Sequence, residues 1–424
     1  MTDPLLPEYD FLVIGAGPAG LLAALTLSGA PHPGKPTQRI ALVDKRDPWR
    51  EPVPCAEAVH RHRLESLIPK VEPEWIRGPV DGAMFIAPDG TPVSFSTPAS
   101  GYLIDRALMH RRLAEQAHAQ GVQCNFRVRV TSLSRLVNGF RTAVYEVAQG
   151  SANPASASNA ARVENASSID KTIGSLRAKV VIDCSGPGMG FGVGEDITQG
   201  NFDVEPAVFA LVKGPKYPVN YIQMFFGTNY APGGYAWLFP RDEHVANVGL
   251  VVGRDYAQEA PARQALKTFL ETTYPGSEIL TFQGGAIPCG YPDAPLAVDN
   301  LYKAGDAANM VHPLSRAGIT EAMTGGKYAA LAGLKTIDIG SELERRLVYS
   351  EYKHDWDLAY GRSHRRLARI KKAFMRISDA SFNRAAHAVA KLPAEKQTIA
   401  RIVFATLWQS PLLLWKMRSV FWTK

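Results

Sequence analysis

Short apolar runs separated by glycine-rich turns dominate the amino-terminal part of the chain. Residues 11–14 form a continuous apolar run, which is typical of a strand buried on both faces. A glycine-rich turn and an apolar helix follow over 15–29, and residues 40–44 predict a second strand. A helix is predicted over 105–119 and another buried strand over 178–184. Strands that alternate with helices predict a parallel sheet of the Rossmann type.

The middle of the chain follows a different pattern. Between residues 207 and 253, apolar stretches alternate with turn residues at the spacing of an antiparallel meander. A strand–turn–helix pattern returns over 301–334, and the residues after it look entirely helical. We therefore predict an α/β fold: a Rossmann-type domain interrupted by an antiparallel β-sheet substrate domain, with a C-terminal helical region. The first part of the Rossmann-type domain is expected over 1–184 and its second part over 291–340. The antiparallel domain is expected over 185–290 and the C-terminal helical region over 341–424. Within 1–184 we expect a strand excursion at about 52–104 and a mobile, Ser/Ala/Asn-rich insert at about 148–175.

Composition and charge exclude several classes of protein. The 424 residues are 46% hydrophobic and 21% charged, as in a packed globular chain and unlike a disordered or polytopic membrane protein. Lys and Arg number 47 against 40 for Asp and Glu. Seven of the basic residues lie between 358 and 378, where there is no acid, so the rest of the chain is balanced at 40 of each sign. We therefore expect no nucleic-acid partner.

Cysteine usage and the apolar segments bear on the compartment. Cys55, Cys124, Cys184 and Cys289 lie far apart with no CxxC pair, so no metal site or iron–sulfur cluster is expected. So few cysteines favour a reducing, cytoplasmic setting. From its acidic start we expect no signal peptide, and the apolar stretch 402–415 is shorter than the ~20 residues that span a bilayer.

A glycine motif lies directly between the first predicted strand and helix. Gly15, Gly17 and Gly20 form GxGxxG, which permits a tight turn, close approach of a pyrophosphate and close helix–strand packing. Asp44 ends the second strand, where an acid can hydrogen-bond a ribose hydroxyl. A second glycine-rich run, 186–194, lacks this spacing and is interpreted as a loop, so no separate nicotinamide domain is expected. The predicted dinucleotide-site residues are Gly15, Gly17, Ala19, Gly20, Asp44 and Lys45.

A later motif indicates which dinucleotide is bound. The stretch 305–308 (GDAA), followed by Pro313 and Gly318 before an apolar helix, resembles the second FAD fingerprint of the para-hydroxybenzoate hydroxylase-like flavoproteins. The resemblance implies that the Asp binds the ribityl chain and that the helix N-terminus faces the flavin, whose reduced form its dipole would stabilise. Arg106 matches the arginine near the FAD phosphates of these proteins, with a helix-surface role as the alternative. The implied FAD contacts are Arg106, Gly305, Asp306, Arg316, Ala317, Gly318 and Ile319.

Three stretches resemble the geranylgeranyl reductase family, and the likeness covers nearly the whole chain. They are PVPCAEAV at 52–59, YAWLFPR at 235–241 and AGDAANMVHPLSRAGITEAM at 304–323. The family reduces isolated double bonds of polyprenyl chains in archaeal lipids, chlorophyll precursors or quinones, and its Y-x-W-x-F-P hairpin lines the isoprenoid cavity. This chain departs from the family pattern at 316–317, where Gly-Glu is common, and at Ser185, where Asp is common.

A set of apolar, mostly aromatic side chains falls on adjacent predicted strands. Such a wall suits a long apolar substrate that offers few polar groups for orientation. Filling of a sheet–helix core is the alternative for any single member. The predicted substrate contacts are Met224, Phe226, Tyr235, Trp237, Phe239 and Pro240.

Cys55 is the candidate catalytic residue. The resemblance places a cysteine of this motif near the isoalloxazine ring of the flavin. Reduction of an unactivated alkene needs a hydride and a proton, and a thiol could donate the proton or position the flavin. A buried structural cysteine is the alternative, and His60, His62 and His312 are weaker candidates for the acid.

The basic run near the carboxyl end has two interpretations. Leu367, Ile370, Phe374 and Ile377 recur at helical spacing within it, and tryptophans 408, 415 and 422 follow. A basic amphipathic helix with nearby tryptophans is typical of attachment to an anionic membrane surface. Packing on the FAD domain is the alternative.

The sequence therefore predicts an FAD-dependent reductase of polyprenyl double bonds. The electron donor would be NAD(P)H or a small electron-transfer protein such as ferredoxin. The protein is expected in the cytoplasm, either free or attached peripherally to the inner face of the membrane. One rival is a flavin-dependent monooxygenase or halogenase on the same fold, although Tyr235 stands at the first position of the halogenase motif W-x-W-x-I-P. The other is a non-catalytic flavin-bearing lipid-binding protein.

Overall fold

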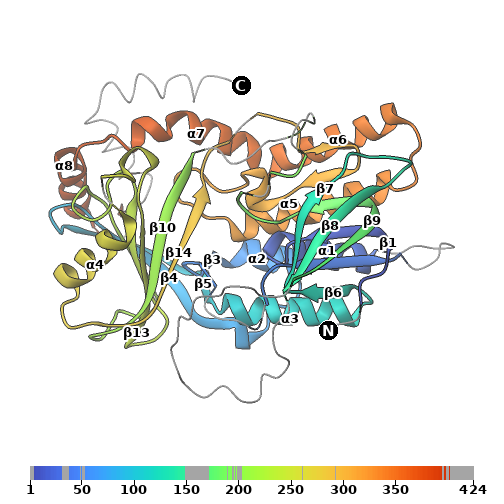
Figure 1. Cartoon of the computed structure of the whole chain (residues 1–424). Helices are drawn as coiled ribbons and strands as arrows, with labels where there is room; N and C mark the ends of the chain where they lie inside the picture. The colour runs from blue at the N-terminus through green and yellow to red at the C-terminus, as the bar shows by residue number, and fades with distance from the viewer. Residues whose placement is uncertain are drawn as a thin grey trace, which may run out of the picture.

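Two eight-stranded sheets stand side by side, each with its own helices, and C-terminal helices lie along one side of both (Figure 1). The predicted combination of a Rossmann-type α/β unit, a largely antiparallel sheet and a helical C-terminal region is confirmed. The computed structural model describes residues 4–30, 38–47, 49, 53–148, 171–188, 190–192, 195, 197, 203–259, 261–291, 293–393, 396–397 and 401.

The first sheet has a parallel core in the order β16-β9-β1-β2-β6, because βαβ crossovers return each strand in the same direction. The antiparallel strands β15, β7 and β8 extend it. Its core strands are nearly all buried, as their apolar runs predict. The elements are β1 (Glu8–Ile14), α1 (Pro18–Gly29), β2 (Ile40–Asp44), α3 (Arg106–Ala119), β6 (Gln123–Phe126), β7 (Val128–Leu133), β8 (Arg141–Ala148), β9 (Lys171–Asp183), β15 (Ala297–Val298), β16 (Leu301–Lys303) and α5 (Ile319–Thr336).

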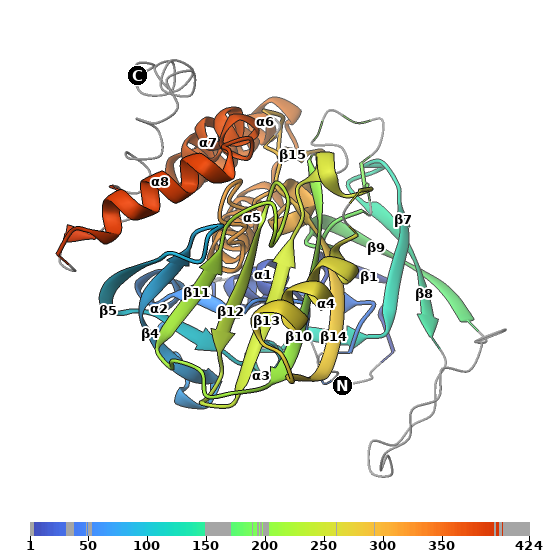
Figure 2. The ribbon, with the colours of Figure 1, turned by 90° about the vertical axis from the view of Figure 1, so that its left-hand side faces the viewer.

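The second sheet runs in the order β14-β10-β13-β12-β11-β4-β5-β3, and Figure 2 looks onto it, with α4 lying across it. All neighbours are antiparallel except β4 and β11, which pair in parallel. Its outer face packs on α4, and the other face carries a separate hydrophobic cluster. The elements are β3 (Ala58–His60), β4 (Ile76–Ile86), β5 (Pro92–Ile104), β10 (Val204–Lys213), β11 (Tyr221–Phe225), β12 (Tyr235–Pro240), β13 (Val245–Val251), α4 (Ala262–Thr273) and β14 (Glu278–Pro288).

Two expectations about segment boundaries change. The strand excursion expected at 52–104 as part of the first domain supplies β3, β4 and β5 to the second sheet, because β4 pairs with β11. The mobile insert expected at 148–175 lies mostly outside the described residues, and its end, 171–175, belongs to β9. The sequence led us to expect strands in 52–104, but a strand pattern carries no information about which sheet the strands join.

The C-terminal region is helical over the residues described. It consists of α6 (Glu342–Trp356), a π-helical turn η4 (Asp357–Gly361), α7 (Arg362–Phe374) and α8 (Asp379–Ala390). Within the described residues, no helix has both the length and the apolar character needed to cross a bilayer. The apolar stretch 402–415 and the three tryptophans at 408, 415 and 422 lie outside the described residues. The shorter elements are α2 (Arg61–Leu67), η1 (Pro73–Trp75), η2 (Arg254–Tyr256) and η3 (Gly305–Ala308).

Candidate active site between the two sheets

The predicted cofactor residues gather at one edge of the first sheet. Gly15 follows β1, Asp44 ends β2, Asp183 ends β9, and Gly305 follows β16 soon after Lys303. These four strands are parallel, so their carboxyl ends meet at the same edge. Ligands of open α/β sheets bind at this edge, near the point where the strand order reverses.

The glycine turn has the geometry of a phosphate cradle. Gly15 has φ +104°, and a Cβ there would lie 2.2 Å from the Cys184 carbonyl oxygen. A Cβ on Gly20 would lie 1.8 Å from the Gly15 oxygen, whereas a Cβ on Gly17 would meet nothing within 4 Å. Helix α1 begins at Pro18 without a side-chain cap. The open side of Gly17 and the uncapped amides therefore fit a pyrophosphate.

Asp44 is held over this turn. Its Oδ2 accepts the Ala16 N–H at 2.6 Å, and its Oδ1 accepts the Arg46 N–H at 2.6 Å. A carboxylate has about four lone-pair sites, so acceptor capacity remains for ribose hydroxyls. The neighbouring Lys45 is exposed, and partial desolvation of its ammonium group together with the Arg46 charge lowers its pKa.

The late motif packs directly against the first. A Cβ on Gly326 of α5 would lie 2.0 Å from the Ala19 carbonyl oxygen, and one on Gly305 would lie 3.1 Å from the Ala19 Cβ. Helices α1 and α5 therefore contact each other backbone to backbone. Burial raises the pKa of Asp306, and the charge of Arg106 opposes that rise. The structure thus brings Arg106, Asp306 and the glycine turn together, and the donor set fits FAD.

The start of α5 combines an uncapped helix end, as expected, with side-chain contacts of Arg316 that the sequence did not predict. Gly318 is the N-cap residue and no side chain caps the helix, so the first amides of α5, which begins at Ile319, have no capping side chain. Arg316 lies in the left-handed region at φ 57°, where family members often have glycine. Its guanidinium turns to the second sheet, with Nη2 2.8 Å from a Glu205 oxygen and Cζ 5.2 Å from the Tyr235 ring centre. The side-chain partners of Arg316 among the described residues are protein groups, and the expected flavin contact of Arg316 stays a prediction.

Arg316 belongs to a buried charge cluster that ties three regions of the chain together. Glu205, at the start of β10, also binds Nζ of Lys371 on α7 at 2.7 Å and Sγ of Cys289 at 3.3 Å. Lys371 binds Asp203 at 2.6 Å as well. The charges at Glu205, Arg316 and Lys371 are nearly inaccessible to water, so each depends on its partner. The cluster joins the second sheet, the loop before α5 and the C-terminal helices.

The loop that carries Cys55 is held from both sheets. Cys55 Sγ accepts the Glu57 N–H at 3.2 Å. From the first unit, Arg106 Nη1 donates to the Pro54 carbonyl oxygen at 3.3 Å. From the second sheet, Asn247 Nδ2 donates to the Cys55 carbonyl oxygen at 2.7 Å. Cys55 therefore lies where the two units meet.

The Glu57 carboxylate fixes the loop further. Glu57 has φ 71° and is buried, and Arg241 holds it through Nε at 2.8 Å and through Nη2. Burial raises the pKa of Glu57, and Arg241 opposes the rise. Sequence reasoning missed Glu57, Arg241 and Asn247. A signal existed for Asn247, since it is the one polar side chain in the strand VANVGLV.

The predicted aromatic wall forms one face of β12. Tyr235, Trp237 and Phe239 alternate with Ala236 and Leu238, which pack on the α4 side. The face also includes Met224 and Phe226, together with Ala56 and Ala58 from the Cys55 loop.

Trp237 Nε1 donates to Asn247 Oδ1 at 3.0 Å, so one amide joins the wall to the cysteine loop. Pro240 ends the strand and is buried.

The histidine alternatives are placed less favourably than Cys55 for proton donation. His60 and His62 are exposed at the start of α2. His312 is half-buried, and its Nδ1 accepts the N–H groups of Leu314 and Ser315 at 3.3 and 3.0 Å. Burial lowers the pKa of His312 to about 4, so its imidazole is uncharged and a weak acid near neutral pH. Among the described residues, no group of three or more His, Cys, Asp or Glu could hold a metal ion.

The basic run divides between internal and exposed positions. Arg365 pairs with Asp293 at 2.7 Å and with Asp357 at 3.0 Å. Lys371 is buried in the Glu205 cluster. Both residues act as internal ties of α7, as the packing interpretation requires. Four arginines remain on the exposed side of the run: Arg362, Arg366, Arg369 and Arg376.

Comparison with known proteins identifies the family. The family model for the geranylgeranyl reductase catalytic domain matches residues 203–287. The digeranylgeranylglycerophospholipid reductase of Methanothrix thermoacetophila is 30% identical over 418 residues, which cover 97% of this chain and 99% of the relative. Our prediction that the chain is a relative of these enzymes is confirmed.

Solved structures share the fold. A geranylgeranyl bacteriochlorophyll reductase-like protein from Thermoplasma acidophilum superimposes with a TM-score of 0.80 at 22% identity, over 97% of this chain and 99% of the other. A myxobacterial FAD-dependent chondrochloren halogenase has a TM-score of 0.61 at 15% identity, over 97% and 98% of the two chains. The halogenase likeness concerns the fold alone, whereas the match to the reductase extends from end to end in sequence: the chain belongs to the geranylgeranyl reductase family of flavoproteins.

Proposed function

We propose that the chain is an FAD-dependent reductase that saturates isolated carbon–carbon double bonds in the polyprenyl chains of a lipid. The observation that carries this proposal is the position of Asn247, which binds the Cys55 carbonyl at 2.7 Å and the Trp237 indole at 3.0 Å. An apolar aromatic face and a thiol loop are thereby held next to each other at the junction with the cofactor edge. The name of the relative from Methanothrix thermoacetophila supports digeranylgeranyl glycerophospholipid as the substrate.

Each group of residues in the candidate site has its own proposed role. The turn around Gly17 would hold the FAD pyrophosphate, Asp44 the ribose, and Asp306 with the start of α5 the ribityl chain and flavin. When bound, reduced FAD supplies a hydride from its N5 atom. The aromatic face of β12 orients the lipid and excludes water, and Cys55 is the candidate that holds the proton.

Two rival functions make different predictions for one experiment. The protein is reduced with dithionite under anaerobic conditions and mixed with digeranylgeranyl glycerophosphate, and the lipid is analysed by mass spectrometry. We expect a gain of two hydrogen atoms per reduced bond without oxygen. A monooxygenase or halogenase would change the lipid only with oxygen, by adding oxygen or halogen. A non-catalytic carrier would bind the lipid and leave its mass unchanged.

We also propose that the enzyme works at the cytoplasmic face of a membrane and takes electrons from NAD(P)H or a ferredoxin-like protein. A lipid substrate and the exposed arginines of α7 support the membrane position. Flavin bleaching by NADPH, NADH or reduced ferredoxin under anaerobic conditions would identify the donor.

Membrane attachment gives a prediction for α7. The FAD-loaded protein should bind anionic vesicles and be released by salt, because each basic residue near the surface contributes about 1 kcal/mol and is screened by ions. The double variant Arg362→Gln/Arg369→Gln should bind about tenfold or more weakly, since both side chains are exposed. Vesicle sedimentation measures both effects. Arg346→Gln on α6, which is 71% exposed and paired with Glu342, serves as the control, and equal binding to neutral vesicles would contradict the prediction.

A further inference from the structure

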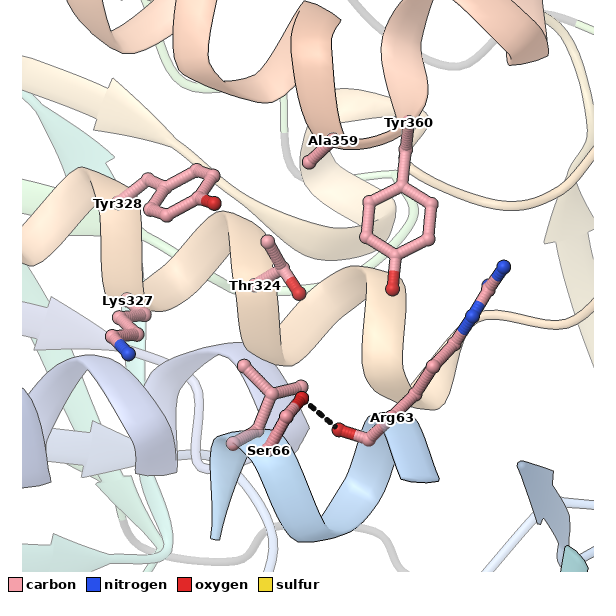
Figure 3. A pocket seen from close by; sticks show the side chains of 8 residues that line it. Arg63, Ser66, Thr324, Lys327, Tyr328, Ala359 and Tyr360 are labelled. Carbon is pink, nitrogen blue, oxygen red and sulfur yellow. Dashed lines mark hydrogen bonds between the residues drawn. The ribbon is translucent and has the colours of Figure 1, made fainter. Parts of the chain in front are cut away.

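A polar pocket of about 340 Å³ lies outside the candidate active site (Figure 3). Its walls come from α2, α5 and the π-helical turn η4, three segments that are far apart in the sequence. The volume falls in the range of small-molecule sites in proteins. The residues that matter are Arg63 and Ser66 of α2, Thr324, Lys327 and Tyr328 of α5, and Tyr360 of η4.

The lining is cationic and rich in hydroxyl groups. Arg63 and Lys327 line the pocket, and no acidic side chain does. In Figure 3 the hydroxyls of Thr324, Tyr328 and Tyr360 turn toward the space between the three segments. Among the residues that the structure describes, Lys327 forms no ion pair with an acid. Two cations with two tyrosine hydroxyls, those of Tyr328 and Tyr360, match an anion that has several oxygens.

The acid that contacts Arg63 is already compensated. Glu321 on α5 is 2% exposed, and its Oε1 lies 3.4 Å from Arg63 Nη1. Its other oxygen accepts the Thr320 hydroxyl at 3.0 Å. The Glu321 charge is therefore paired with Arg63. Burial raises the pKa of the pocket residue Tyr328, and Asp355 lies close enough for its charge to raise that pKa further. Lys327 is the lining cation that forms no ion pair with a described acid.

Ion pairs hold the pocket wall at the π-helical turn. Asp357 begins this turn and is held by Lys353 Nζ at 2.9 Å and Arg365 Nη2 at 3.0 Å. The turn presents Tyr360, over whose ring the Arg63 guanidinium carbon lies at 5.1 Å. A short π-helix inside a longer helical run is a frequent mark of a functional site, because it costs regular hydrogen bonding.

The position of the pocket links it to the active site. Thr324 lies six residues after the N-cap Gly318, roughly 9 Å along α5 at 1.5 Å per residue. Arg63 lies on the helix that follows the Cys55 loop, and its charge lowers the pKa of His312 in the loop before α5. A ligand in the pocket would be close enough for another part of the same molecule to enter the active site.

We propose that this pocket binds the phosphate ester group of a ligand that also reaches the active site. The ester is either the glycerophosphate head of the lipid substrate or a phosphate of a pyridine nucleotide. The first case rests on the proposed function, because it makes the pocket the head-group subsite of the reductase. Arg63 and Lys327 supply the charge, and the hydroxyls of Tyr328 and Tyr360 supply further hydrogen bonds. The Ser66 and Thr324 hydroxyls donate to the carbonyl oxygens of Arg63 and Thr320, so they face the ligand as acceptors only.

Equilibrium binding to the FAD-loaded protein tests the proposal without turnover. The probes are sn-glycerol 1-phosphate, digeranylgeranyl glycerophosphate in detergent, geranylgeraniol and NADPH. Arg63→Gln and Lys327→Gln should each weaken binding of sn-glycerol 1-phosphate about tenfold or more, since each removes a charge-assisted hydrogen bond. The matched control for Arg63→Gln is Arg61→Gln on the same helix, because Arg61 also pairs with an acid, Glu65, and lies over an aromatic ring, that of Tyr102. The matched control for Lys327→Gln is Lys335→Gln on α5, where Lys335 pairs with Glu351.

The pattern of losses identifies the source of the phosphate. Weaker digeranylgeranyl glycerophosphate binding with unchanged NADPH binding assigns the lipid head group, and the reverse assigns the nucleotide. Geranylgeraniol, which has no phosphate, should bind equally to all variants. The proposal is overturned if no phosphate probe binds. It is also overturned if Arg61→Gln and Lys335→Gln weaken binding of the phosphate probes as much as Arg63→Gln and Lys327→Gln do. If Arg63→Gln unfolds, the result for Lys327→Gln decides whether the pocket binds phosphate. Failure of the proposed function is a different outcome, in which the unaltered protein does not reduce double bonds.

Discussion

Replacement of Asp306 by alanine should release most of the FAD. Asp306 follows β16 at the carboxyl edge of the parallel sheet, beside the turn whose Gly305 packs on Ala19. We assign its carboxylate to a hydroxyl of the ribityl chain, and a hydrogen bond to a charged group contributes about 1.5–3 kcal/mol. Its loss corresponds to roughly a tenfold to hundredfold weaker affinity. The absorbance of purified protein and titration with FAD measure the change.

Two further variants separate this role from a general loss of stability. Asp306→Asn keeps an acceptor oxygen and should retain more FAD than Asp306→Ala. Asp255→Ala removes a carboxylate that is 61% exposed on the second unit and should leave FAD content unchanged. Stoichiometric FAD in Asp306→Ala would contradict the assignment of the late motif.

The cofactor edge could be predicted from sequence because its geometry is local. The positive φ of Gly15 follows from a tight turn after a buried strand, and the GxGxxG spacing encodes that turn within six residues. The positions of Asp44 and Gly305 then follow from the rule that parallel strands end at the same edge. The aromatic face of β12 was equally accessible, since alternation along one strand determines it.

The long-range ties could not be predicted, because their members are far apart in the chain. Glu205 and Lys371 are separated by more than 160 residues, and nothing in either local pattern marks a partner. Lys371 sits in a run of basic residues that resembles a solvated or membrane-facing surface. Its burial depends on two acids at the start of β10, Asp203 and Glu205. The same limit applies to the pair of Glu57 and Arg241.

Replacement of Cys55 by alanine should slow the oxidation of the reduced enzyme by lipid about 10²-fold or more. Alkene reduction adds a hydride and a proton, and the Cys55 loop lies beside an apolar face that excludes water. Loss of a general acid typically costs 10²–10⁴-fold. The variant should still bind FAD and accept electrons from dithionite, because the assigned phosphate and ribityl contacts involve other residues. Anaerobic stopped-flow with a polyprenyl substrate measures the rate.

Three comparisons decide what Cys55 does. Cys124→Ala removes a thiol buried in the first unit, against the Ala114 carbonyl, and should leave the rate unchanged. Asn247→Ala removes the hydrogen bond to the Cys55 carbonyl, and it should slow oxidation less than Cys55→Ala because the thiol itself remains. Recovery of the rate in Cys55→Ser would show that the residue acts through its size or hydrogen bond rather than through thiol acidity. An unchanged rate in Cys55→Ala would mean that Cys55 only packs, and the proton would then have to come from water or from a histidine such as His312.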